Sequence, residues 1–70
     1  MKQSAREILA ANVKALRKER SWSQDELADR AGFHRTYVGT VERCEQGITI
    51  DSLEKLAKAF GVSPARLLEE

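Results

Sequence analysis

A glycine between two short helical segments constrains the fold of this chain more than any other sequence feature. Ser23 and Glu26 match a capping box, in which Ser23 accepts from a backbone N–H of the first turn and Glu26 accepts from the N–H of Ser23. Gly32 can end that helix in a left-handed conformation. A second helical segment, about residues 34–43, begins almost at once. The sequence therefore predicts two short helices joined by a turn of about three residues.

Helical spacing of apolar residues continues on both sides of this pair, and no segment alternates as a half-buried strand does. Gly61 is the expected end of one further helix. The expected starts of the other helices are Ser4 in a capping box with Glu7, Thr49 or Asp51, and Ser63 before Pro64. We therefore predict an all-α fold, a single compact domain of five helices over residues 1–70.

The chain has too few cysteine and histidine residues for a covalent or metal cross-link. Its 70 residues include one cysteine and one histidine, too few for an internal disulfide or a four-ligand zinc site. A chain of this length buries only about 60% of its unfolded surface, so we expect it to pair with a second copy. The sequence has no glycine-rich phosphate loop and no histidine paired with a nucleophile, so we expect neither an enzyme nor a metal or cofactor site.

Charge is distributed unevenly although the net charge is only +1. Residues 1–20 carry six basic and two acidic groups, whereas residues 44–70 carry three basic and five acidic groups. Such a molecule can present one basic face to a polyanion. No apolar run approaches the ~18 residues that span a bilayer, and no signal-peptide core follows Met1. We therefore expect that the protein makes no membrane contact and is located in the reducing cytoplasm.

Three segments in the predicted helix pair carry a recurring combination of residues. The small side chain of Ala28 lets the two helices approach closely, and Gly32 allows the sharp turn between them. The three segments are residues 23–32, Tyr37-Val38 and Val41-Glu42-Arg43. At this spacing the chain resembles the lambda-repressor/Cro-type (XRE-like) helix-turn-helix regulators of bacteria and phages, over about residues 13–68. The resemblance implies a lambda-repressor-like DNA-binding domain. Its helix-turn-helix would span about residues 23–43, and residues 50–70 would serve packing and dimerisation.

Within that family, residues 34–38, Glu42-Arg43 and the segment 49–53 look especially like the controller proteins of restriction–modification systems. The resemblance implies a small homodimer that regulates its own gene together with an endonuclease gene. The chain departs from the pattern after Arg43. The group has Gly or Asn where Cys44 stands, and a basic residue followed by Asn where Gln46-Gly47 stand.

The resemblance implies that Arg35, Thr36 and Thr40 contact DNA bases, because the family's base-reading residues occupy these positions. The guanidinium of Arg35 can pair with O6 and N7 of a guanine, which makes it the main candidate for sequence specificity. A threonine can offer a hydroxyl to a base edge or phosphate and a methyl group to thymine.

Other residues are candidates for holding the DNA backbone, which fixes register rather than sequence. Gln24 matches the glutamine with which the family contacts a phosphate at the start of a helix. Arg43 and His34 are further phosphate candidates, and Tyr37 is equally suited to a phosphate contact or to packing.

Arg17 and Glu42 match a pair that the family places between the first helix and the recognition helix. The resemblance implies that this ion pair is structural and sets the angle of the recognition helix. Trp22 is expected in the core rather than stacked on bases, and Phe33 and Phe60 are expected in the core as well. Cys44 is expected to be an unreactive small residue.

The expected partners are double-stranded DNA and a second copy of the chain, with RNA polymerase as a further candidate. The operator would be an inverted repeat with half-sites about one helical turn, ~34 Å, apart. Candidates for apolar surface left for the dimer interface are Ile50, Phe60, Val62, Leu67 and Leu68. Two alternatives stay open. One is a phage-type repressor or antitoxin of the same fold, and the other is an adaptor that binds protein instead of DNA.

Overall fold

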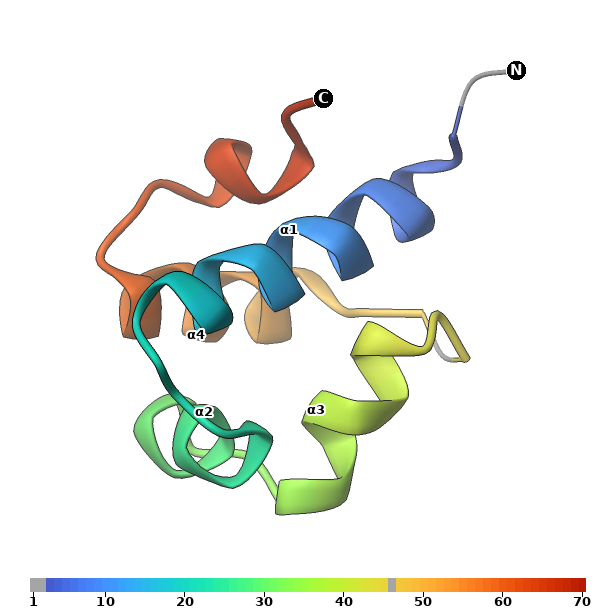
Figure 1. Ribbon diagram of the computed structural model, residues 1–70. Helices are drawn as coiled ribbons and strands as arrows, with labels where there is room; N and C mark the ends of the chain where they lie inside the picture. Colours follow the sequence, from blue (N-terminus) through green and yellow to red (C-terminus); the bar gives the residue numbers. More distant parts are fainter. Residues whose placement is uncertain (1–2, 46) are drawn as a thin grey trace.

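The computed structural model of the protein describes residues 3–45 and 47–70, so Gln46, one of the positions that depart from the controller pattern, lies outside the described residues. The described ranges contain helices and connecting loops but no strand. Figure 1 shows α2 and α3 together at one end of the molecule, with α1, α4 and the chain's last turn at the other. The elements are α1 (Ala5–Glu19), α2 (Gln24–Ala31), α3 (Arg35–Glu42), α4 (Ile50–Phe60) and the 3-10 turn η1 (Pro64–Leu68).

The prediction of an all-α fold is confirmed, but the prediction of five α-helices is wrong. The segment after Ser63 is a 3-10 turn of five residues, which is too short to build a regular ladder of α-helical hydrogen bonds. Ser63 precedes Pro64 as expected, yet its side chain makes no capping hydrogen bond. None of the helices in the described ranges is both long and apolar enough to cross a bilayer.

Helix starts follow the local sequence signals closely. The Ser4 N–H donates to Glu7 Oε1 at 2.9 Å and the Glu7 N–H donates to Ser4 Oγ at 3.1 Å, which completes the predicted capping box. Because it accepts hydrogen bonds from Ser4, the carboxyl group of Glu7 has a lowered pKa. Of the two candidates for the start of α4, Thr49 is the N-cap, accepting from the Ser52 N–H at 3.1 Å.

At the start of α2 only half of the predicted capping box forms. Ser23 Oγ accepts from the Glu26 N–H at 3.0 Å. The Glu26 side chain was expected to return to the backbone of Ser23, but it pairs with Arg30 one turn later, at 2.9 Å. An oppositely charged side chain four residues along the helix is a competing partner for the carboxylate.

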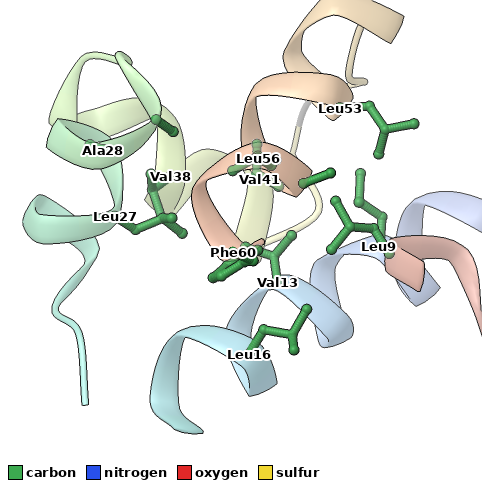
Figure 2. Packing of buried hydrophobic residues seen from close by; sticks show 13 residues of the cluster. Leu9, Val13, Leu16, Leu27, Ala28, Val38, Val41, Leu53, Leu56 and Phe60 are labelled. Atoms are coloured by element: carbon green, nitrogen blue, oxygen red, sulfur yellow. The ribbon is translucent and has the colours of Figure 1, made fainter. Parts of the chain in front are cut away.

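The core lies where α1, α2, α3 and α4 meet, and Figure 2 shows side chains from all four helices converging there. Leu27 and Val13 are fully buried, and Val38 and Val41 turn one face of α3 toward them. Trp22 and Phe33 pack against this cluster while half-buried, in agreement with the expectation of a packing role. The opposite face of α3 is therefore left to solvent.

Phe60 was expected in the core and was also a candidate for the dimer surface, and the structure gives it the core role. Leu67, a candidate for the dimer surface, is likewise buried, which corrects that assignment. Phe60 is 4% exposed and stacks on Trp22 with ring centroids 5.9 Å apart, and Leu67 has no exposed surface. The last turn is fixed against α1 because Asn12 Nδ2 donates to the carbonyl oxygens of Leu67 and Glu69, each at 2.9 Å. Both residues complete the core of one chain.

The end of α3 requires a left-handed residue, and Cys44 occupies that position with φ +62°. The Cys44 N–H donates to the carbonyl of Val41 at 3.0 Å, and the Glu45 N–H donates to the carbonyl of Thr40 at 3.1 Å. These bonds close the last turn of the helix. A residue with a Cβ is strained in this conformation, which explains the Gly or Asn of the controller pattern.

We expect Cys44→Gly to raise the free energy of unfolding by about 1 kcal/mol, because glycine removes the strain of the left-handed backbone. Urea denaturation of the two proteins measures the difference. Cys44→Ala is the matched control, since it also removes the thiol but keeps the Cβ, and it should give no gain. Equal stabilities of the glycine and alanine variants would contradict the argument from backbone strain.

Candidate nucleic-acid interface

The face of α3 that points away from the core carries the three predicted base-contacting residues. Arg35 and Thr36 are exposed in the first turn, and Thr40 is partly exposed one turn later. Val38 and Val41 lie on the opposite face, which packs into the core. The amphipathic pattern of this eight-residue helix therefore sets its orientation. Figure 1 shows α3 at the edge of the molecule with no other helix covering its outer side.

The hydroxyl groups on this face already make local hydrogen bonds. Thr40 Oγ1 donates to the carbonyl of Thr36 at 3.0 Å, which uses its hydrogen and leaves its methyl group and an acceptor lone pair for a ligand. Thr36 Oγ1 lies 2.9 Å from His34 Nδ1. In the described part of the chain the guanidinium of Arg35 takes part in no ion pair. Arg35 therefore presents its guanidinium donors to solvent.

His34 precedes α3 as its N-cap, and its Nδ1 accepts from the Thr36 N–H at 3.3 Å. The side chain thus has a structural contact at the start of the helix, and α3 itself begins at Arg35, one position after the start that the sequence suggested. Tyr37 is half-buried, and its ring packs against Phe33 at a centroid distance of 4.7 Å. Packing, one of the two roles considered for Tyr37, is therefore present in the structure.

Gln24 is the first residue of α2 and lies beside α3. Its Nε2 donates to Glu42 Oε1 at 3.1 Å, so the amide is held by the neighbouring helix instead of rotating in solvent. Arg43, just after α3, forms an ion pair with Glu45 with Nε and Oε2 3.1 Å apart. Both phosphate candidates thus lie next to the exposed face of α3 with their side chains oriented by carboxylates.

Arg17 and Glu42 form a bidentate ion pair between α1 and α3. Arg17 Nε lies 2.7 Å from Glu42 Oε2, and Nη2 lies 3.0 Å from Oε1. The third nitrogen, Nη1, donates to the carbonyl of Trp22 at 2.8 Å. The hydrogen bond to Glu42 raises the pKa of Arg17. The side chains are 11% and 4% exposed, so this is a nearly buried pair in which the charge of Glu42 is compensated.

Arg20 is an important residue that sequence patterns did not indicate. Its Nη1 donates to the carbonyl of Leu16 at 3.0 Å and its Nη2 to the carbonyl of Phe60 at 2.7 Å. The guanidinium also lies 5.7 Å from the ring centroid of Trp22. It ties the end of α1 to the end of α4. Nothing in the sequence distinguishes it from the basic residues that precede it, because the carbonyl of Phe60 comes near only when the chain folds.

Comparisons with known proteins agree with this geometry. A family model described as helix-turn-helix matches residues 13–67. Control protein C.SmaI of Serratia marcescens is 48% identical over 63 residues, which cover 90% of this chain and 75% of that protein. The crystal structure of the restriction–modification controller protein C.AhdI from Aeromonas hydrophila matches with a TM-score of 0.85 at 32% identity, covering 89% of this chain and 94% of that one.

A third match was solved with nucleic acid present. The structure of SinR, a master regulator for biofilm formation, in complex with DNA matches with a TM-score of 0.82 at 35% identity. The match covers 87% of this chain and 98% of that one. The chain therefore belongs to the helix-turn-helix family of DNA-binding transcription regulators, and a restriction–modification controller is among its relatives.

Proposed function

We propose that this protein is a sequence-specific transcription regulator that binds an inverted-repeat operator in double-stranded DNA as a homodimer. Its proposed targets are restriction–modification genes, including its own, and it would act in the bacterial cytoplasm where those genes are transcribed. The observation that carries the proposal is the exposed face of α3, where Arg35, Thr36 and Thr40 lie beside Gln24 and away from the core.

In this arrangement α3 enters the major groove and α2 crosses the DNA backbone. Arg35 is in the first turn of α3, the part of a recognition helix that meets base edges, and it pairs with a guanine. Thr40 offers its methyl group to a thymine. An adaptor that binds protein has no need for a free guanidinium and two threonines at this position.

The α2 N-terminus supports a role in holding the DNA backbone. Gln24 is its first helical residue, and unpaired backbone N–H groups at a helix start attract anions. Arg43 adds a positive charge on the same side. Contacts of this kind fix the protein's register on DNA without selecting a sequence. As a regulator of transcription, the protein would contact RNA polymerase or exclude it from the promoter.

An apolar groove is the proposed dimer interface. Ile50 at the start of α4 is 71% exposed and Leu68 at the end of η1 is 42% exposed, which makes them the exposed large apolar residues of the described chain. Both line one groove with Leu53. Val62 lines a separate depression. Because Phe60 and Leu67 are buried, the groove around Ile50 and Leu68 is the part of the candidate surface that we propose for the dimer. A second copy would cover it with its own Ile50 and Leu68.

We expect Ile50→Glu to convert the dimer into a monomer, because it places a charge in the apolar centre of the interface. Sedimentation equilibrium measures the change, and binding to a full inverted repeat should weaken more than binding to a single half-site. Ala15→Glu is the control, since it adds the same charge at an exposed position of α1. A wild-type chain that stays monomeric at high micromolar concentration would overturn the dimer, and an Ile50→Glu dimer would overturn this interface.

Selection of bound duplexes from a random pool tests the proposed function. The enriched sequence should be an inverted repeat with half-site centres about one helical turn, ~34 Å, or a near multiple apart. Affinity for it should fall with salt, each neutralised phosphate adding about −0.9 to the slope of log K against log salt. A pool that shows no enrichment would overturn sequence-specific binding.

A further inference from the structure

Gly39 stands in the middle of α3, where glycine is less favourable than alanine because its backbone has more freedom to lose. The residue is buried although it lies on the side of the helix near the proposed DNA surface. A Cβ atom added to Gly39 would lie 2.9 Å from Arg43 Nη1 and 3.3 Å from Gln24 Oε1. Two polar side chains therefore occupy the space that any larger residue would fill.

The first of these side chains reaches Gly39 because of helix geometry. Side chains on an α-helix lean toward its N-terminus and cover the residue four positions earlier, which for Arg43 is Gly39. The ion pair between Arg43 Nε and Glu45 Oε2, at 3.1 Å, holds the opposite edge of the guanidinium. Arg43 is thereby laid along the helix surface instead of extending into solvent.

The second side chain arrives from the neighbouring helix. Gln24 Nε2 donates to Glu42 Oε1 at 3.1 Å, and this bond turns the other amide atom, Oε1, toward Gly39. Glu42 is itself fixed by Arg17. The position of Gln24 is therefore set through a chain of contacts from α1 to α3 to α2.

Both side chains line a hollow of about 280 Å³ between α2 and α3. Its lining brings two guanidinium groups and the first turn of α2 together with a single carboxylate. The lining residues are Gln24, Asp25, Arg35, Thr36, Gly39 and Arg43. The balance of charge and the helix start both favour an anion.

We propose that Gly39 is a positioning residue that lets the guanidinium of Arg43 lie beside the start of α2 and bind a DNA phosphate group in this hollow together with the first backbone N–H groups of α2, an inference that rests on the proposed DNA binding. Any side chain at position 39 would push the guanidinium of Arg43 away from Gln24. The glycine thus exchanges some helix stability for a phosphate site that is shared by two helices.

The test is a double-mutant cycle with Gly39→Ala and Arg43→Ala, measured by fluorescence anisotropy on the selected operator. Gly39→Ala should weaken binding by about tenfold, the loss of one charge-assisted contact, and should reduce the salt slope by about one phosphate. In the Arg43→Ala background the same change should have little further effect. The melting temperature should stay equal or rise, because alanine favours the helix.

Lys58→Ala provides the control background, since Lys58 is an exposed basic residue of α4 that lines other depressions. Gly39→Ala should keep its tenfold effect there. An equal loss in the Arg43→Ala background would show that Gly39 does not act through Arg43, and no loss in the wild-type background would exclude the positioning role. Either result overturns the inference.

A readout without DNA separates this inference from the proposed function. In the free protein, with labelled arginine, an NMR cross-peak between the Gly39 Hα and the Arg43 guanidinium protons is expected, and its absence would overturn the placement. A wild-type protein that shows this cross-peak but enriches no duplex from the random pool would overturn the proposed function and, with it, the phosphate site.

Discussion

Replacing Glu42 with alanine is expected to lower the free energy of unfolding by about 3 kcal/mol. The substitution leaves the guanidinium of Arg17 only 11% exposed and without its carboxylate, and it also removes the partner of Gln24. A domain of this length is stabilised by only about 0.05–0.15 kcal/mol per residue, so the loss is a large share of the total. Urea denaturation followed by circular dichroism measures it.

Glu26→Ala is the matched control for this prediction. Glu26 also pairs with an arginine, Arg30, at 2.9 Å, but the two side chains are 43% and 49% exposed. Solvent screens such a pair, so its loss should change stability by less than about 1 kcal/mol. Replacing both members of the buried pair, as Arg17→Met with Glu42→Leu, should recover much of the loss because no unpaired charge remains. Equal effects of Glu42→Ala and Glu26→Ala would contradict the assignment of a stabilising buried pair.

Replacing Arg35 with alanine is expected to cost about 1–3 kcal/mol of binding free energy on the selected operator and little on random DNA. The exposed guanidinium takes part in no ion pair in the described structure, so the substitution removes a ligand contact without disturbing the fold. Fluorescence anisotropy on the two duplexes, with melting temperature as the folding check, measures the effect.

Two further variants sharpen this prediction. Arg35→Lys keeps the charge but not the planar fork, so it should lose specificity for guanine while keeping affinity for random DNA. Lys58→Ala removes one positive charge at an exposed position of α4 and should leave the ratio of the two affinities unchanged. An equal loss on operator and random DNA for Arg35→Ala would assign Arg35 to the DNA backbone.

Local signals explain why most of the fold could be predicted from sequence. Gly32 and Gly61 end α2 and α4 with φ of +79° and +73°, conformations in which a residue with a Cβ is strained. Ser4 and Thr49 start their helices through hydrogen bonds within one turn. The fifth helix was wrong because Ser63-Pro64 indicates a helix start but not whether enough residues follow to build an α-helix.

Burial was harder to predict, because it depends on residues distant in sequence. Leu67 has the same side chain as Leu68, yet Leu67 is buried while Leu68 is exposed, and the hydrogen bonds from Asn12 to this last turn help to hold Leu67 in the core. The same limit applied to Arg20, whose carbonyl partner on Phe60 is forty positions away.

The candidate interface was predictable in part. The spacing of Val38 and Val41 fixed which side of α3 faces the core, and so which side Arg35 and Thr36 share with solvent. The position of the Arg43 guanidinium, in the space that a Cβ on Gly39 would occupy, depends on side-chain direction and was not anticipated. Sequence position alone also could not show that the hydroxyl of Thr40 is already bonded within the helix.

An NMR titration of the labelled protein with the selected duplex tests most directly the central claim that the outer face of α3 reads DNA. We predict that the largest amide and side-chain shifts occur at Gln24, at Arg35 and Thr36, and at Thr40 and Arg43, while the signals of α4 around Lys58 change little. Shifts concentrated on another surface, with the signals of Arg35, Thr36 and Thr40 unmoved at saturation, would contradict it.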